Sequence, residues 1–313
     1  YRAAAASPKK RPRAKPDGTN PRGKRNHFFS HRVPATSITV DSFYAAKDDP
    51  AKSVYFLTHF HSDHYGGLRK STLPEGARVY CSSVTASLVH SQLRVRKESI
   101  VVLPIAEVVS EGKLDYLHLD TTYCNPQYVF PYQANVLQQV VHAAKEENRR
   151  TKGQCLFFFG TYSIGKEKVF FAVAEALNLK IYAGKRKRGI LEQCAFGAKL
   201  TGRLVNSAGE ARVQVVSMRA LSADGLREYA VRNSLNTSFI GRGLAIVFRP
   251  TGWTFRGDAS KPRQLVAFVK WCKPARVVPT VNARSKEDAD KLRALLGHTD
   301  TPLRRISSLP LPS

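Results

Sequence analysis

The order of apolar segments along the chain predicts an α/β protein. Short apolar runs of strand length alternate with segments whose apolar residues recur at the period of a helix, and turn residues separate many of them. Repeated alternation of strands and helices favours an α/β architecture. A length of 313 residues suggests about two domains, and we find no internal repeat.

Ten segments have the length and composition of strands. In chain order they are 38–40, 54–57, 77–81, 100–103, 114–119, 155–159, 180–182, 213–218, 244–248 and 277–281. Six further segments are expected to be helices: 83–93, 133–148, 166–177, 223–233, 263–271 and 285–296. Between them, 197–209 is expected to be a loop, and a basic run at 185–188 follows the strand at 180–182.

The charge of the chain indicates a polyanionic partner. Fifty Lys and Arg residues face 24 Asp and Glu residues, which gives a net charge of +26 and a pI near 10.2. Such an excess repels itself and favours binding to nucleic acid. A membrane surface is the competing partner for positive charge, but no apolar run has the length needed to span a bilayer and no basic amphipathic helix stands out.

The cysteines point to a reducing compartment. Five are scattered along the chain without a Cys-x-x-Cys pair, at Cys81, Cys124, Cys155, Cys194 and Cys272. This pattern argues against a disulfide framework and against a cysteine zinc site. No secretory signal is visible in the sequence given.

Both ends of the chain are expected to lack a fixed fold. Residues 1–26 carry nine Lys or Arg against one acid, Asp17, and no aliphatic side chain larger than alanine. Such a segment cannot bury enough apolar surface, so we expect a disordered basic arm. Its run at 9–15 reads as a nuclear localisation signal or as a phosphate-binding tail, with a solvated tail of no consequence as the alternative. Residues 298–313 are expected to be a flexible tail.

Four residues that can bind metal follow the strand predicted at 54–57. His59, His61, Asp63 and His64 stand within six positions, before the Gly66-Gly67 turn. A strand end delivers residues two apart to the same side, so His59 and His61 can face one ion, while Asp63 and His64 face a neighbouring position. Imidazole and carboxylate donors suit zinc or a similar ion. The alternative is a surface cluster of polar residues.

Two further motifs follow predicted strands. Asp120 ends the strand at 114–119 and could be a metal ligand or orient one, or it could cap the turn with Thr121 and Thr122. The segment 160–168 places Ser163, Lys166 and Lys168 at a predicted helix start, where free N–H groups favour a phosphate. It is not a Walker A loop, because Glu167 stands where a magnesium-binding hydroxyl is needed. A helix start capped by Ser163 is the alternative.

Together these segments resemble the metallo-β-lactamase/β-CASP nucleases of DNA cross-link repair, the family of Artemis and Apollo, and within it the interstrand cross-link repair 5′ exonucleases. The matching segments are 39–43, 55–68, 119–126, 160–170, 248–254 and 278–282. The resemblance implies a metallo-β-lactamase αββα sandwich, here incomplete, with an inserted β-CASP α/β domain. The implied division is a lactamase part at 27–119, the β-CASP domain at 120–256 and a second lactamase part at 257–297.

The resemblance implies roles for the histidine-rich loop. Asp41 is similar to the aspartate that supports the metal site from behind. His59 and His61 resemble the ligands of a first ion, and Asp63 and His64 those that face a second. One or two Zn²⁺ ions are therefore the implied cofactors. Asp63 is also the implied catalytic residue that orients the attacking water.

The resemblance adds residues outside this loop. Asp120 matches the acidic first β-CASP motif and is the second implied catalytic residue, with Tyr123 in support. Val281 stands where DNA-acting members carry valine and RNA-processing members histidine, which favours DNA. The implied cleft would hold phosphates with Ser163 and six basic residues: Lys166, Lys168, Lys185, Arg186, Lys187 and Arg188.

Three parts of the family pattern are absent from this sequence. A histidine in a His-Cys-Pro-Gly context and an aspartate in Gly-Asp-Phe-Arg are expected between the histidine-rich loop and Asp120, and a β-CASP histidine is expected within 257–278. The gaps, near 104–114 and 256–264, look like excised blocks, as an incomplete gene model or an evolved loss would leave. Each ion would then keep two recognisable ligands, against the roughly three of a hydrolytic zinc site.

The resemblance implies a nuclear, monomeric 5′→3′ exonuclease that acts on single strands or 5′-phosphorylated DNA ends in interstrand cross-link and double-strand-break repair. The missing ligands leave a catalytically inactive DNA-binding relative as the main alternative. An RNA-processing nuclease is disfavoured by Val281. A small-molecule lactamase or thioesterase-like hydrolase is disfavoured by the charge and the insert.

Overall fold

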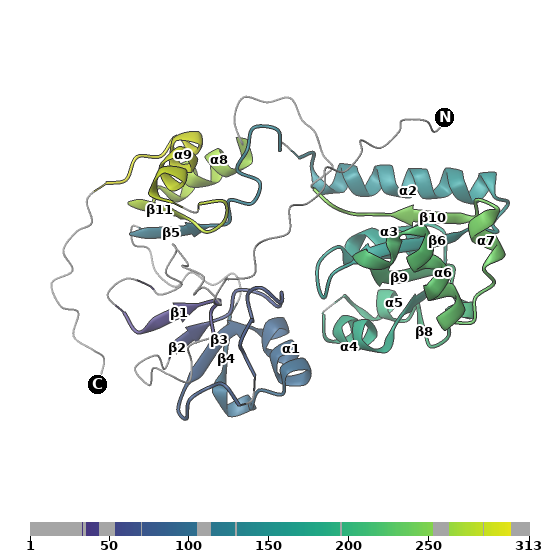
Figure 1. Ribbon diagram of the computed structural model, residues 1–313, viewed down its shortest axis with the longest axis horizontal. Helices are drawn as coiled ribbons and strands as arrows, with labels where there is room; N and C mark the ends of the chain where they lie inside the picture. Colours follow the sequence, from purple (N-terminus) through teal and green to yellow (C-terminus); the bar gives the residue numbers. More distant parts are fainter. Residues whose placement is uncertain are drawn as a thin grey trace, which may run out of the picture.

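The computed structural model describes residues 33, 36–43, 54–69, 71–104, 114–128, 130–194, 196–252, 263–283 and 285–301. In these ranges the strands form three sheets, and every strand pair is parallel. Helices lie against the sheets (Figure 1). The predicted α/β class is therefore confirmed.

The first sheet carries the histidine-rich loop. Its strands, in the order β1-β2-β3-β4, are β1 (Ile38–Val40), β2 (Val54–Phe56), β3 (Arg78–Ser82) and β4 (Ile100–Leu103). Helix α1 (Ser83–Leu93) follows β3 and begins at Ser82, whose hydroxyl accepts the Thr85 amide. A 3-10 turn at Lys97–Ser99 leads into β4. Tyr55, Leu57, Phe60 and Leu88 are almost fully buried in the core of this sheet.

The second sheet has five strands in the order β10-β6-β9-β7-β8. They are β6 (Leu156–Thr161), β7 (Ile181–Ala183), β8 (Leu204–Val205), β9 (Val213–Ser217) and β10 (Ala245–Phe248). Its helices are α2 (Gln133–Arg150), α3 (Glu167–Ala176), α4 (Lys185–Gln193), α5 (Ala198–Thr201), α6 (Ala223–Arg232) and α7 (Ser238–Gly241), with 3-10 turns at Ala208–Glu210 and Met218–Leu221. Strands covered on both faces read as continuous apolar runs, as β6 does.

The third sheet is the pair of β5 (Tyr116–Leu119) and β11 (Arg276–Pro279), with Leu117 opposite Val277. Helices α8 (Arg263–Cys272) and α9 (Lys286–Leu296) accompany it (Figure 1). The core of this unit includes Leu119, Val277 and Leu296. The whole five-stranded sheet thus lies between β5 and β11 in the sequence.

Helices α1 and α4 join the first sheet to the five-stranded sheet. Ile190 of α4 is buried in the same cluster as Leu88 and Val89 of α1. The Ser91 hydroxyl donates to the Gln193 side chain at 2.7 Å. This contact places the histidine-rich loop beside the carboxyl ends of the strands in the second sheet.

The structure bears out the ten predicted strands and six predicted helices, with boundaries shifted by a few residues. The loop predicted at 197–209 is wrong, because it contains α5, the two-residue strand β8 and a 3-10 turn. The basic run at 185–188 begins helix α4, which was not predicted. Its first five residues are polar or glycine, so the sequence shows no helical period there.

The structure bears on the cysteines, on membrane-spanning helices and on the start of the C-terminal tail. All five cysteines are free thiols, and burial raises the pKa of Cys81 and Cys124 to about 11. No helix in the described ranges is both long and apolar enough to cross a membrane. The basic arm at 1–26 and the tail from 302 lie outside the described residues. The first residues of the predicted flexible tail, 298–301, are described, and the Thr301 amide donates to Ala275 O at 2.9 Å. This part of the tail is therefore bound to the fold.

Candidate metal centre and adjoining basic cavity

The predicted metal-binding residues lie together at the carboxyl ends of β1 and β2. Asp41 follows β1, and the loop after β2 carries the three histidines. The ring centroid of His59 lies 4.5 Å from that of His61 and 4.0 Å from that of His64. Parallel strands present their carboxyl ends at one edge of the sheet, which is where α/β proteins place their sites.

Asp41 holds the loop by three hydrogen bonds. Its Oδ1 accepts the Thr58 amide at 2.8 Å, and its Oδ2 accepts the Thr58 hydroxyl and His64 Nδ1, both at 2.7 Å. Its backbone has a φ of 51°, a left-handed conformation that is rare outside glycine. Burial alone would raise the Asp41 pKa, but the hydrogen bonds from His64 and Thr58 lower it below its ordinary value. Asp41 therefore stays ionised and orients His64 from behind.

His64 and Asp63 form the outer side of the centre. The hydrogen bond to Asp41 raises the pKa of His64, and the negative charges of Asp41, Asp63 and Asp120 add to the shift. His64 Nε2 lies 3.7 Å from Asp63 Oδ2, and the Asp63 side chain is 81% exposed. Asp63 is thus open to a ligand arriving from solvent.

The protons of His59 and His61 can be assigned from their outer partners. The single Thr58 hydroxyl proton goes to Asp41, so Thr58 Oγ1 must accept from His59 Nδ1, which lies 3.0 Å away. His61 Nε2 lies 3.0 Å from the Ile164 carbonyl oxygen, which can only accept. When both imidazoles are neutral, each therefore carries its proton on the outer nitrogen.

The inner nitrogens then face each other as two lone pairs. His59 Nε2 and His61 Nδ1 are 2.9 Å apart. Protonation of His59 does not relieve this contact readily, because burial and the charges of His64 and His61 lower the His59 pKa. Two facing lone pairs at this distance are the arrangement that a metal cation stabilises.

The donor types suit zinc, but the described residues bring them together only in pairs. With Zn–N bonds of about 2.0–2.1 Å, two tetrahedral ligands lie about 3.4 Å apart. The pairs found here, His59 with His61 and Asp63 with His64, are separated by 2.9 and 3.7 Å. Among the described residues, no three His, Cys, Asp or Glu side chains converge on a single ion position.

Asp120 lies within electrostatic reach of His64, which its charge helps to protonate. Its Oδ1 accepts the amide and the hydroxyl of Thr122 at 2.8 and 2.6 Å. The turn-capping contact suggested as the alternative role is therefore present. One carboxylate oxygen serves the turn, and Oδ2 remains for a ligand.

The β5–β11 pair brings Val281 next to the Asp120 turn. The Val281 amide donates to Thr121 Oγ1 at 3.2 Å, and the Thr121 hydroxyl donates to Val281 O. Tyr123 packs edge-on against Tyr128 and Phe130, with centroids 5.0 Å away in each case. A side chain at Gly252 would meet Tyr123 Cζ and Phe130 Cζ at 2.9 Å, so glycine allows this packing.

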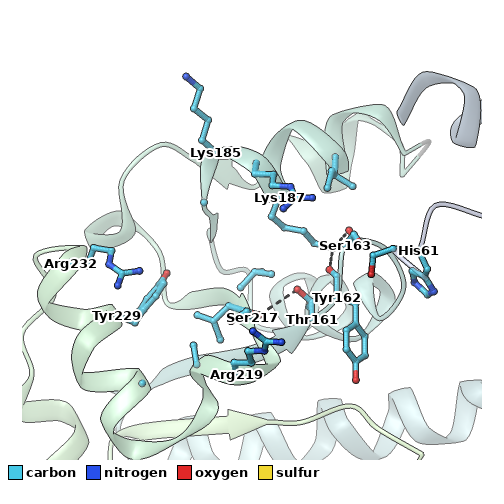
Figure 2. A pocket seen from close by; sticks show the side chains of 18 of the residues that line it. His61, Thr161, Tyr162, Ser163, Lys185, Lys187, Ser217, Arg219, Tyr229 and Arg232 are labelled. Carbon is cyan, nitrogen blue, oxygen red and sulfur yellow. Dashed lines mark hydrogen bonds between the residues drawn. The ribbon is translucent and has the colours of Figure 1, made fainter. Parts of the chain in front are cut away.

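A cavity of about 1150 Å³ extends from the metal centre across the carboxyl ends of β6, β7 and β9 (Figure 2). Four of the predicted phosphate-binding residues line it: Ser163, Lys185, Arg186 and Lys187. His61 and Asp63 line its near end, and Arg219 and Arg232 line the part near α6. Part of the candidate metal centre therefore shares one cavity with these basic side chains.

The basic residues that line the cavity differ in whether an ion pair or hydrogen bond already occupies their charged group. Lys185, Arg186 and Arg219 are exposed, and no ion pair holds them within the described part of the chain. Lys187 instead donates to two carbonyls and Glu167. Arg232 is paired with Glu228.

The remaining predicted phosphate ligands lie outside the cavity lining. Lys168 donates to the Gln133 side chain at 3.3 Å, and Arg188 bonds Glu192 and Asn206. Lys166 is exposed at the start of α3. Sequence reasoning missed Arg219 and Arg232. Arg219 could have been predicted, because it follows the carboxyl end of β9, whereas no sequence signal indicates Arg232.

Comparison with known proteins places the chain in a family. No protein-family model matches it. It is 31% identical to the DNA cross-link repair protein SNM1 of Arabidopsis thaliana over 85% of this chain and 68% of that protein. It is also 31% identical to the DNA cross-link repair 1A protein of Gallus gallus, over 81% of this chain and 32% of the relative. The 5′ exonuclease Apollo of Gallus gallus is 23% identical over 80% of this chain and 63% of the relative.

The fold and the site define a parallel α/β protein that carries a histidine-rich loop at the carboxyl ends of its strands. The chain belongs to the SNM1 family of DNA cross-link repair proteins. This confirms the resemblance found in its motifs. The chain spans about a third of the length of the DNA cross-link repair 1A proteins it matches.

Proposed function

We propose that this chain is a metal-dependent nuclease that hydrolyses DNA phosphodiesters in the 5′→3′ direction from a 5′-phosphorylated end. It would act in interstrand cross-link and double-strand-break repair in the nucleus. The observation that carries the proposal is the 2.9 Å separation of His59 Nε2 and His61 Nδ1, the inner nitrogens of the two imidazole rings. Membership of the SNM1 family and the basic cavity beside these nitrogens support it.

The proposed architecture is a metallo-β-lactamase domain interrupted by a β-CASP domain. The lactamase parts would be 27–119 and 257–297, and the insert 120–256. The pairing of β5 with β11 supports this division, because it returns the chain to the same place after the five-stranded sheet is complete. The two gaps in the family pattern, near 104–114 and 256–264, lie largely outside the described residues.

His59 and His61 would hold one zinc ion, and Asp63 and His64 would face a second. A bound zinc ion polarises a phosphoryl oxygen and lowers the pKa of its water to about 7. The chain supplies the orientation. Asp41 fixes the His64 ring, and Thr58 and Ile164 fix the protons of His59 and His61. Asp63, whose carboxylate is exposed, and Asp120 would orient the attacking water.

The basic cavity would bind the DNA strand and its terminal phosphate. Lys185, Arg186 and Arg219 supply charge. Ser163 supplies a hydroxyl, and Lys166 a further exposed ammonium at the start of α3. Phosphate contacts of this kind are independent of base sequence, and the net charge of +26 adds long-range attraction. Single strands or 5′-phosphorylated ends are therefore the proposed substrate, bound by a monomer.

The test combines metal analysis with a nuclease assay on 5′-phosphorylated single strands. Purified wild-type protein should contain zinc and should shorten the strand, and a chelator should stop the reaction. A variant with both His59→Ala and His61→Ala should lose zinc and activity while keeping its fold and most of its DNA affinity. A wild-type chain that binds no divalent metal and cleaves no strand would overturn the nuclease assignment.

The second candidate is a DNA-binding relative without catalysis. It is favoured by the two-donor sites, since no third protein ligand joins either pair among the described residues. The same assay separates the candidates. Tight DNA binding without zinc or cleavage supports the second, whereas chelator-sensitive cleavage supports the first.

A double substitution tests the proposed phosphate contacts. Replacing Ser163 and Lys166 with alanine should weaken binding of a 5′-phosphorylated strand more than binding of the same strand with a 5′-hydroxyl. The reason is that both groups are assigned to the terminal phosphate. Equal affinity of the variant and the wild type for the phosphorylated strand would remove this assignment.

A further inference from the structure

One hydrogen-bond partner of the candidate metal centre belongs to the five-stranded unit. His61 Nε2 lies 3.0 Å from the carbonyl oxygen of Ile164, which belongs to the turn between β6 and α3. This bond decides which nitrogen of His61 is free. We propose that Lys187, braced by Glu167, is a positioning residue that holds this turn and so fixes the tautomer of His61. The inference deepens the proposed metal site.

Lys187 is committed to the turn. Its Nζ donates to Tyr162 O at 3.1 Å, to Ser163 O at 2.9 Å and to Glu167 Oε1 at 2.7 Å. An ammonium has three N–H groups, so these partners use all of them. Figure 2 shows Lys187 reaching from α4 to the turn beside His61. Sequence reasoning assigned Lys187 to DNA, but in the structure its side chain is only 13% exposed and its ammonium is bonded to the protein through all three N–H groups.

The pair of Lys187 with Glu167 is shielded from water. The two side chains are 13% and 6% exposed. Removing one member of such a pair leaves an unpaired buried charge, so the remaining partner would draw in water or move. The turn would move with it, because the other two Lys187 contacts are the carbonyls that precede Ile164.

The turn needs this support from outside. Gly165 and Lys166 are both left-handed, with φ of 84° and 75°. Lys166 is the N-cap of α3, and no side chain of the described residues caps this helix. The Ser163 cap offered as an alternative from the sequence is therefore wrong. With no side-chain cap, the ammonium of Lys187 orients the Tyr162 and Ser163 carbonyls, while the Ile164 side chain packs against the core of the first sheet.

The tautomer of His61 matters because the other tautomer, with the proton on Nδ1, would leave no free nitrogen facing an ion. If the Ile164 carbonyl withdrew, His61 could place its proton on Nδ1 and donate it to His59 Nε2, which is 2.9 Å away. That hydrogen bond would occupy both inner nitrogens. The contact with Ile164 therefore keeps two donors free for an ion, and the position of the turn controls metal affinity.

The tautomer can be read from the ¹⁵N signals of the His61 ring in metal-free protein, assigned by comparison with His61→Gln. The wild type should show a protonated Nε2 and an unprotonated Nδ1. Lys187→Met removes the three N–H groups at similar length, and it should give a mixture of tautomers and a zinc affinity lower by about 10–100-fold, measured by calorimetry. Lys187→Arg, which restores donors and charge, should recover part of that affinity.

The matched control is Lys199→Met. Lys199 also pairs with a glutamate in the five-stranded unit, Glu175, but both side chains are exposed and neither touches the turn. This variant should keep the wild-type tautomer and zinc affinity. A folded Lys187→Met protein with both properties unchanged would overturn the proposal. Should that variant fail to fold, the wild-type spectrum still decides, since a protonated Nδ1 in the metal-free wild type refutes it. The ring signals do not depend on nuclease activity, so an inactive enzyme leaves this result readable.

Discussion

Asp41 joins the two strands that carry the candidate metal centre. Among the described residues, its carboxylate accepts hydrogen bonds from the loop after β2, through Thr58 and His64. All of these donors need an oxygen, and an asparagine amide would turn an N–H group toward at least one of them. Asp41 is therefore the residue where a change of one atom should disturb the centre without changing its size.

Replacing Asp41 with asparagine should weaken zinc binding by about 10–100-fold, which is the usual effect of losing a partner behind a ligand. Titration calorimetry measures this change directly. Asp290→Asn is the control, since Asp290 is an exposed carboxylate on α9 that pairs with Arg293. If folded Asp41→Asn bound zinc as the wild type does, the supporting role of Asp41 would be wrong.

The spacing of the histidines was sufficient to predict that His59, His61, Asp63 and His64 gather at a strand end. Alternate residues of a strand point the same way, and this rule needs no knowledge of the rest of the fold. The free nitrogen of each ring could not be predicted. For His61 it depends on the Ile164 carbonyl, 103 residues further along the chain. Sequence patterns describe neighbours within an element and do not identify such distant partners.

Strand β6 shows how three consecutive aromatic residues serve two cores. Phe157 and Phe159 pack with Phe170 of α3 on one face of the sheet, while Phe158 packs with Leu226 of α6 on the other. All three phenylalanines are 0% exposed. Because both faces of β6 are covered, its sequence is a continuous apolar run, which is why it was predicted to be a buried strand.

Phe159→Ala should lower the free energy of unfolding by about 3–5 kcal/mol, because it leaves a cavity in the centre of the sheet. Phe159 stacks on Phe248 of β10, with ring centroids 4.7 Å apart. Denaturant titration followed by circular dichroism gives the value. Val231→Ala on α6 should change stability little, since Val231 is 71% exposed. A loss below about 1 kcal/mol for Phe159→Ala would contradict this view of the core.

Gly252→Ala should destabilise the protein by about 1–3 kcal/mol through overpacking. The added methyl group would meet the rings of Tyr123 and Phe130 at 2.9 Å, so the rings or the backbone must shift. Thermal unfolding measures the loss. Gly241→Ala is the comparison, because a methyl group there has open space around it. Equal melting temperatures for the two variants would show that the aromatic cluster yields easily.

Helix α4 shows which elements the sequence could not predict. It begins with four basic residues and a glycine, and only Ile190 and Leu191 are buried. Two apolar positions do not establish a helical period. The helix is instead stabilised by its neighbours, through Ile190 in the core of the first sheet and through Lys187 in the turn before α3. Both contacts join segments that are remote in sequence.

At the scale of the whole molecule, part of the excess positive charge is concentrated at the cavity. Lys185, Arg186 and Arg219 come from two different segments and meet at the carboxyl ends of the central strands. Net charge predicted the polyanionic partner, but the location of the binding surface required the topology of the sheet. Each unpaired cation there should contribute separately to the salt dependence of DNA binding.

Arg219→Ala should reduce the affinity for a single strand and lower the slope of log K against log salt by about 0.7, the value for one phosphate contact on a single strand. Fluorescence anisotropy at several salt concentrations measures this slope. Arg227→Ala on α6 should leave it unchanged, because Arg227 pairs with Asp224 and does not line the cavity. An Arg219 variant with the wild-type slope would place the strand elsewhere.

The pairing of β5 with β11 also constrains the order of assembly during synthesis. The amide of Val281 reaches Thr121 across 160 residues of chain, whereas the strands between them pair within a much shorter span. Contacts of long sequence separation form late, so the five-stranded unit can fold on the ribosome before β11 has emerged. Asp120 would take its place near His64 only after β11 has been synthesised and has paired with β5.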